Sequence, residues 1–249
     1  NSGKIAMGDK INIVVPTGNF GNILAAYYGY CMGMPVNKFI CASNSNNVLT
    51  DFINTGVYDK NRDFYTTVSP SMDILVSSNL ERLLYKLSRN DDVKTAQWIK
   101  ELKTTGKYTV DDEVKSQIQK LFYGGYCDDT ATKETIGKMY KENNYLCDTH
   151  TAVAVNVYGK YVDETGDKTP CVLASTASPY KFSRAVMEAV SGNKELPEDD
   201  FAIVDMLKEL TNTQVPKPLM AIKDKKVRFE DVVKSENMAD YVLNVLGVE

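Results

Sequence analysis

The chain has 249 residues, of which 43% are hydrophobic and 25% are charged, and its formal net charge is −4. These totals are typical of a soluble globular protein with one large domain or two ordinary ones. Because the basic residues form no stripe or block, they argue against a nucleic-acid partner. The longest apolar stretch, residues 23–35, is shorter than the ~20 residues that a membrane span needs, so we expect no membrane partner either.

The first quarter of the chain reads as strand, helix, strand, helix. Residues 11–15, "INIVV", are a short, uncharged, β-branched run of the kind found in buried parallel strands. A helix is predicted over 22–34, a strand over 37–42 and a short helix over 48–56. This alternation predicts a parallel sheet with right-handed crossovers.

The middle of the chain changes character. Its charged, amphipathic pattern predicts four helices, over 79–90, 91–105, 111–122 and 131–143. We expect no strand between Leu80 and Cys147, so residues 80–146 are predicted to form a helical insertion subdomain.

The alternation returns after residue 147. A helix is predicted in "HTAVAVNVYGKYV", a strand in "TPCVLAST", and a helix in "KFSRAVMEAVSG" that ends at Gly192. The predicted fold class is therefore α/β, with helices on both faces of a parallel sheet. Residues 1–79 and 147–196 form the α/β domain, and residues 197–249 form a helical C-terminal segment.

Five scattered cysteines and one histidine limit the possible site chemistry. Without a C-x-x-C pair, a structural zinc site or a disulfide framework is not expected. Free thiols favour a reducing compartment, so we predict a cytoplasmic protein. A lone His150 argues against a histidine-based metal site and against a serine–histidine triad, and we predict no metal.

The turn "TGNFGN", residues 17–22, is the strongest candidate for a binding site. The first N–H groups of a helix lack intrahelical partners, and the helix dipole adds partial positive charge there. Two glycines let the backbone approach an anion. The turn is neither a G-x-G-x-x-G nor a Walker A motif. On its residues alone, it fits phosphate or carboxylate binding and an ordinary βα turn equally well.

The longer stretch "PTGNFGNILAAYYGYCMGMP" closely resembles the cofactor-phosphate loop of threonine synthase. That family is pyridoxal-phosphate (PLP) dependent and has the tryptophan-synthase-β-like fold, also called fold type II. Three more stretches resemble the same family in the same order: "SNSNNVLTDFINTGVYD", "SPSMDILVSSNLERLLY" and "DTHTAVA…STASPYKF". The related dehydratases have a more glycine-rich phosphate loop, so the resemblance favours threonine synthase among its relatives.

The resemblance implies a set of cofactor-binding residues. The backbone amides of one loop would hold the PLP phosphate, and these are the amides of Gly18, Asn19, Phe20, Gly21 and Asn22. Thr176 would place a neutral hydroxyl at the pyridine nitrogen. Without the resemblance, Thr176 would be interpreted as a residue that closes a strand by local hydrogen bonding.

Three further residues are candidates for the site, and two of them, His150 and Lys181, keep two interpretations each. His150 has the chemistry of an acid or base, yet a histidine in the first turn of a helix is commonly structural. Ser178 and Lys181 are candidates to meet a substrate phosphate. Lys181 is equally well explained as a solvated residue at the start of its helix.

The resemblance also implies that the Schiff-base lysine lies upstream of the glycine loop. Neither Lys4 nor Lys10 lies in a stretch that resembles the lysine motif of the family. The chain opens with Asn1 rather than methionine, and "NSGKIAMGDK" reads as the end of a helix closed by Gly3 or Gly8. We therefore expect the C-terminal portion of a threonine synthase, with no catalytic residue of its own and with the N-terminal part of the same protein as its partner.

The intact enzyme, by resemblance, converts O-phospho-L-homoserine and water into L-threonine and phosphate with PLP as cofactor. Two other functions stay open. One is another PLP lyase of the same fold, such as a threonine dehydratase. The other is a non-catalytic anion-binding module.

Overall fold

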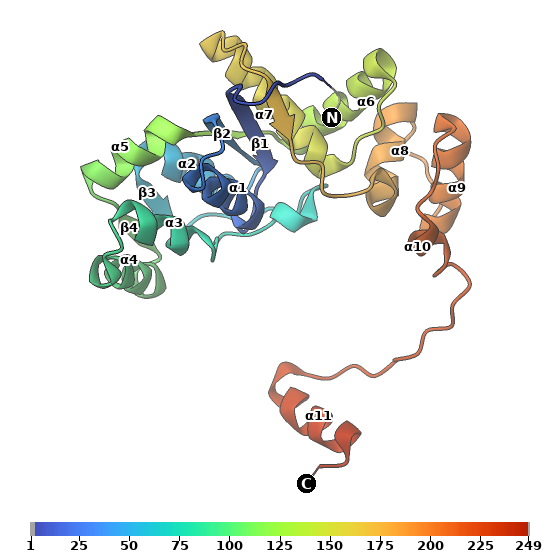
Figure 1. Cartoon of the computed structure of the whole chain (residues 1–249). Coiled ribbons are helices and arrows are strands. Elements are labelled where there is room, and N and C mark those ends of the chain that lie inside the picture. Colours follow the sequence, from blue (N-terminus) through green and yellow to red (C-terminus); the bar gives the residue numbers. More distant parts are fainter. Residues whose placement is uncertain (1–2, 249) are drawn as a thin grey trace. The chain divides into compact units, whose positions relative to one another are not determined.

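The computed structural model describes residues 3–248 (Figure 1). The chain divides into two compact units, one that ends at Gln214 and one that begins at Val215. Within the described residues, no helix is both long enough and apolar enough to cross a membrane.

A four-stranded parallel sheet forms the centre of the first unit, in the order β5-β2-β1-β6. The strands are β1 (Ile11–Pro16), β2 (Val36–Ser43), β5 (Phe122–Tyr126) and β6 (Cys171–Leu173). Because all four run the same way, the loops that follow them meet at one edge of the sheet.

Helices cover both faces of this sheet, as predicted (Figure 1). Helices α1 (Gly21–Cys31) and α2 (Val48–Thr55) pack with Ile13 in one hydrophobic cluster. Helix α7 (Thr149–Thr165) packs with Val14 in a second cluster on the other face. Successive strand residues point to opposite faces, so the apolar residues of β1 contribute to both layers.

The prediction of no strand between Leu80 and Cys147 was wrong. Strand β5 pairs with β2 from Phe39 opposite Phe122 to Ser43 opposite Tyr126. A second, two-stranded antiparallel sheet joins β3 (Val57–Asp59) to β4 (Lys107–Thr109).

Two consecutive glycines explain why β5 does not read as a strand. A Cβ atom at Gly124 would lie 3.0 Å from the Cα of Thr50 on α2. A Cβ atom at Gly125 would lie 2.7 Å from Cγ1 of Val157 on α7. The glycine pair therefore lets helices approach both faces of the strand closely, whereas in the sequence it is typical of a turn.

The four predicted helices of the middle segment are present as α3 (Leu80–Leu87), α4 (Asp92–Thr104), α5 (Asp112–Leu121) and α6 (Asp129–Asn143). An aspartate caps the N-terminus of each of the last three: Asp91, Asp111 and Asp128. The division of the first unit at residues 80 and 146 stays a prediction.

The rest of the first unit is helical. A 3₁₀ turn, η2 (Pro179–Phe182), leads into α8 (Ser183–Ser191), which ends at Gly192 with a left-handed φ of 71°, as predicted. Helix α9 (Asp200–Thr211) packs against α8.

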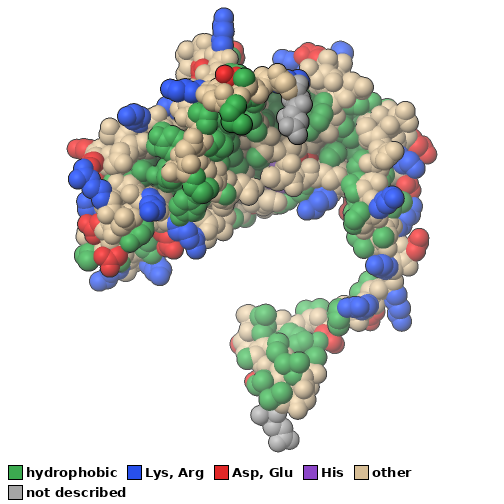
Figure 2. All heavy atoms as spheres, in the orientation of Figure 1, with side chains coloured by type: hydrophobic (Ala, Val, Ile, Leu, Met, Phe, Trp, Pro, Cys, Tyr) green, Lys and Arg blue, Asp and Glu red, His purple; other side chains and the backbone are tan. Residues whose placement is uncertain are grey.

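The second unit contains α10 (Lys217–Met220), the 3₁₀ turn η3 (Ser235–Asn237) and α11 (Met238–Leu246). Residues 225–234 form no helix, so the C-terminal segment is less helical than predicted. Hydrophobic side chains are exposed on the surface of this unit (Figure 2).

At the other end of the chain, Gly3 and Gly8 have the positive φ of helix-ending glycines. Residues 3–10 nevertheless contain no helix. The part of this predicted helix end that falls on residues 1–2 lies outside the described residues.

Candidate functional site

The loop after β1 has a strained backbone at one residue. Phe20, directly before α1, has φ 60° and ψ 14°, a left-handed conformation that costs a bulky residue ~1–3 kcal/mol. Its side chain is only 1% exposed and its ring centroid lies 5.9 Å from that of Phe122. Burial of this ring anchors the strained turn in the core.

The same loop presents unpartnered backbone donors. Within residues 3–248, the structure gives the N–H groups of residues 18–22 no protein acceptor. Helix α1 has no side-chain cap and no acidic residue in its first turn. The N–H groups and the positive end of the helix dipole are therefore left for an anion.

The two glycines of the loop have different surroundings. A Cβ atom at Gly18 would lie 2.9 Å from the carbonyl oxygen of Ser71 and 3.0 Å from the Cα of Met72. At Gly21 the nearest atom would be Nδ2 of Asn79, 3.7 Å away. Neither glycine has a positive φ. Gly18 is thus required by the protein's own packing, whereas a Cβ atom at Gly21 would make only an ordinary van der Waals contact.

Asn19 ties the loop to the segment before α3. Its Oδ1 accepts hydrogen bonds from the backbone N–H of Ser78 (2.6 Å) and from the Ser78 hydroxyl (2.8 Å). The Asn79 side chain donates to the carbonyl oxygen of Asn19 over 2.7 Å. Asn19 therefore positions the loop through its side chain.

This loop forms one wall of a cavity of about 270 Å³ at the carboxyl ends of β1 and β6. The other walls come from η1 (Pro70–Met72), the start of α7 and the loop after β6. The cavity brings together all six predicted cofactor-binding residues, namely Gly18, Asn19, Phe20, Gly21, Asn22 and Thr176. Their role in binding stays a prediction.

The charge around this cavity favours an anion. Among the described residues that line it, Lys181 carries the one permanent charge, and no carboxylate is present. The Lys181 ammonium also lies 5.9 Å from the centroid of the Phe182 ring. Ser178 is used locally, since its hydroxyl accepts a hydrogen bond from the Tyr180 N–H and caps η2.

His150 lines the cavity but is committed to structural hydrogen bonds. Its Nε2 accepts from the backbone N–H of Ser71 (3.2 Å), which requires the ring proton to lie on Nδ1, 3.0 Å from Oδ1 of Asp148. Burial acts to raise the pKa of Asp148, but hydrogen bonds from His150 and Thr151 outweigh it and hold that pKa below its usual value. Because its Nε2 lone pair is already in use, the structural interpretation of His150 is favoured.

Three residues that the sequence analysis missed hold η1 in place. The Asn44 side chain donates to Oδ1 of Asp73 (2.7 Å), and Asn46 donates to the same oxygen (3.1 Å). Thr67 donates to Asp73 through both its hydroxyl and its N–H. The signal available in the sequence was "SNSNN" directly after a predicted strand, because polar residues at that edge often support a site.

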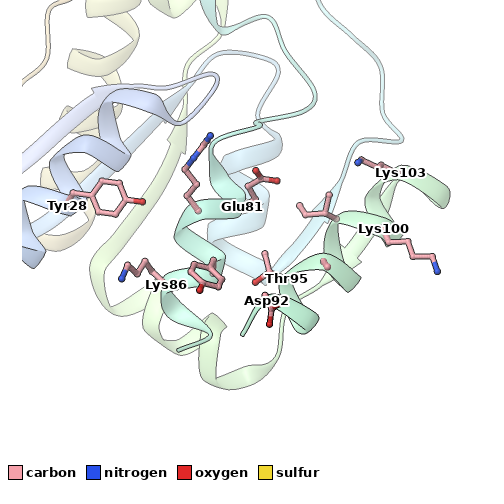
Figure 3. Close-up of a pocket in the computed structure, with 11 residues that line it drawn as sticks. Tyr28, Glu81, Lys86, Asp92, Thr95, Lys100 and Lys103 are labelled. Carbon is pink, nitrogen blue, oxygen red and sulfur yellow. The ribbon is translucent and has the colours of Figure 1, made fainter. Parts of the chain in front are cut away.

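A second, larger cavity of about 700 Å³ lies among α1, α3 and α4 (Figure 3). Tyr28, Tyr85 and Ile99 contribute apolar surface. Charges of both signs surround it, from Glu81, Arg82, Lys86, Asp92, Lys100 and Lys103. Its lining lacks the glycine loop and the free helix start of the smaller cavity, which is therefore the better candidate site.

The chain resembles known proteins of one family. Residues 151–242 match the family model described as "Threonine synthase, C-terminal". The chain is 41% identical over 192 residues to the human protein "Threonine synthase-like 1", covering 76% of this chain and 25% of the relative. It is 38% identical over 216 residues to the threonine synthase of Saccharomyces cerevisiae, covering 81% of this chain and 42% of the relative.

Solved structures agree with these relatives. The PLP-bound threonine synthase from Brucella melitensis superposes with a TM-score of 0.70 at 32% identity, covering 83% of this chain and 46% of the other. The yeast threonine synthase gives a TM-score of 0.69 at 34% identity, covering 85% and 48%. The chain thus spans between a quarter and a half of the length of these proteins. The predicted resemblance and the α/β fold are confirmed: the chain is similar in sequence and fold to threonine synthases, and its residues 151–242 match the model of that family's C-terminal region.

Proposed function

We propose that this chain holds the cofactor phosphate in a PLP-dependent threonine synthase. The whole protein would convert O-phospho-L-homoserine and water into L-threonine and phosphate. The observation that carries this proposal is the group of N–H donors from Gly18 to Asn22 that have no acceptor among residues 3–248, in a cavity whose described lining contains no carboxylate. The homology to threonine synthases supports the same reaction.

The residues of the cavity fit the two polar ends of PLP. A phosphate dianion suits backbone donors at a helix start and needs no particular side chain beside them. Thr176 lines the same cavity, and its hydroxyl has no hydrogen-bond partner among the described residues. A neutral hydroxyl there would pair with the pyridine nitrogen. A carboxylate would enforce protonation of that nitrogen, whereas a hydroxyl would not.

The proposed roles of this chain's residues are binding and orientation. When bound, PLP supplies an electron sink for reactions at the substrate carbons. The loop amides would fix the phosphate end, Thr176 would fix the ring end, and Lys181 would add positive charge beside the phosphate. His150 would keep η1 in place.

We also propose that the chain has no Schiff-base lysine of its own. Lys181 is the lysine that lines the cavity, whereas Lys4 and Lys10 do not. The catalytic lysine would come from the N-terminal part of the same protein, in the family's order. All five cysteines are free, which supports a reducing, cytoplasmic location.

The test is product formation from O-phospho-L-homoserine. A complete protein that contains this region should release threonine and phosphate in equal amounts, and the 249-residue chain with PLP should release neither. A complete protein that deaminates threonine but ignores O-phospho-L-homoserine would identify a dehydratase instead. Turnover by the isolated chain above a PLP-only control would contradict the assignment of the lysine.

A further inference from the structure

The His150 ring joins three segments that surround the cavity. It belongs to the first turn of α7, it accepts a hydrogen bond from Ser71 of η1, and its centroid lies 4.7 Å from that of the Phe182 ring at the end of η2. His150 is 4% exposed. One side chain thus contacts two other elements that line the cavity, η1 and η2.

Asp148, which lies beside Nδ1, fixes the orientation of the His150 ring. The Asp148 side chain is fully buried and accepts from the backbone N–H of His150 at 2.9 Å as well as facing Nδ1. Thr151 donates its hydroxyl to the other carboxylate oxygen. With the proton held on Nδ1, the ring presents a neutral acceptor to η1 and adds no charge to the cavity.

The segment that His150 holds is in tight contact with the glycine loop. The Ser71 carbonyl and the Met72 backbone leave no room for a Cβ atom at Gly18. A displacement of η1 would therefore change the space beside Gly18, the first of the free amides. Ser71 therefore links the two residues directly. Its N–H donates to His150, and its carbonyl oxygen lies against Gly18.

We propose that His150 is a positioning residue for the phosphate loop, acting through the Ser71 N–H to hold η1 against Gly18. This inference rests on the proposed function for the identity of the anion. The contact between Ser71 and Gly18 does not depend on which anion is bound. Loss of one hydrogen bond to a backbone N–H would weaken phosphate binding about three- to tenfold.

Three substitutions at position 150 distinguish the role of the hydrogen-bond acceptor from the role of the aromatic ring. His150→Phe keeps a ring that can pack on Phe182 but removes the acceptor. His150→Gln places an amide oxygen near the position of Nε2, whereas His150→Asn, of the same chemistry, reaches only the position of Nδ1. The Gln and Asn variants are therefore a matched pair that differ in reach.

The experiment uses the 249-residue chain and inorganic phosphate, with thermal unfolding to confirm that each variant is folded. We expect weaker phosphate binding, faster hydrogen exchange at the Ser71 N–H and a lower NMR order parameter at Gly18 in the Phe and Asn variants. In the Gln variant, phosphate affinity, the exchange rate at Ser71 and the order parameter at Gly18 should all be closer to the wild-type values. Equal impairment of the folded Gln and Asn variants, or no change in any of the three, would overturn the proposal.

The hydrogen-exchange and order-parameter measurements also distinguish a failure of this inference from a failure of the proposed function. If wild-type chain bound no phosphate but Ser71 and Gly18 still responded to the acceptor at position 150, the proposed anion site would fail and the positioning role would stand. If phosphate bound normally to every variant, the positioning role alone would fail.

Discussion

The two cavities of the first unit differ in what forms their walls. The larger one, about 700 Å³, is lined by long side chains of α1, α3 and α4 with both signs of charge. The smaller one, about 270 Å³, is lined by a backbone turn, short side chains and one lysine. Fixing a long charged side chain costs up to ~2 kcal/mol of conformational entropy, whereas the donors of a folded turn are already in place. Preorganised, unpartnered polar groups, rather than volume, are therefore the reason that the smaller cavity is proposed as the binding site.

The strongest test of this comparison is Gly18→Ala. The added methyl would lie 2.9 Å from a backbone oxygen, so η1 or the loop must move, at a cost of ~1–3 kcal/mol. We expect phosphate and PLP binding to fall more than tenfold, measured by titration, with a lower melting temperature. The matched control is Gly29→Ala on α1, where the added methyl meets only the flexible end of Met34 at 3.0 Å. Wild-type affinity in the Gly18 variant would show that the contact with η1 does not shape the site.

The next test is Thr176→Val, which keeps the shape of the side chain and removes its hydroxyl. An unpaired pyridine nitrogen costs ~1–3 kcal/mol, so PLP affinity should fall about tenfold. The affinity for inorganic phosphate should not change, because Thr176 is proposed to face the ring. Thr95→Val in the larger cavity is the control and should affect neither ligand. A loss of phosphate binding in the Thr176 variant would place its hydroxyl at the wrong end of the cofactor.

A smaller effect is expected from Lys181→Met. Lys181 is exposed, and an exposed ion pair is worth up to ~1 kcal/mol, so phosphate affinity should fall about two- to fivefold. Added salt should reduce the difference between variant and wild type. Lys100→Met removes one of the cations of the larger cavity and should leave phosphate affinity unchanged. Equal losses in both variants would mean that only the net charge matters.

The smallest expected effect is on stability at low pH. The pKa of Asp148 is lower in the folded chain than in the unfolded one, so its contribution is present above the unfolded pKa of about 4 and is lost as the pH falls through the folded value. Thermal unfolding of wild type below about pH 4 should therefore show a steeper loss of stability than that of Asp148→Asn. Parallel pH profiles would contradict the hydrogen bonds assigned to this carboxylate.

The sequence predicts those parts of the fold that local signals determine. The β-branched run at residues 11–15 and the glycine stops at Gly56 and Gly192 correspond to β1, α2 and α8. Strand β5 could not be predicted, because Gly124 and Gly125 acquire their role only when two helices pack on them. Its pairing with β2 is a tertiary property.

The same limit applies to the site. The loop from Gly18 to Asn22 and Thr176 could be located from the resemblance, and the structure brings them to one cavity. The bonds of Asp73 to Asn44 and Asn46 span more than 25 residues, so no local pattern announces them. The hydrogen-bond donor to His150 Nε2 is a backbone N–H, and every residue type except proline has one, so the sequence does not identify this partner.

The central claim is that the turn after β1 holds the phosphate of PLP, and its most direct test is a ¹H–¹⁵N NMR titration of the chain. Inorganic phosphate and PLP should both shift the amide resonances of residues 18–22 in a saturable manner. Pyridoxal, which has the ring but no phosphate, should leave these amides unchanged. If phosphate and PLP shift other amides instead, or if pyridoxal shifts residues 18–22 as strongly as PLP does, this turn is not the phosphate site.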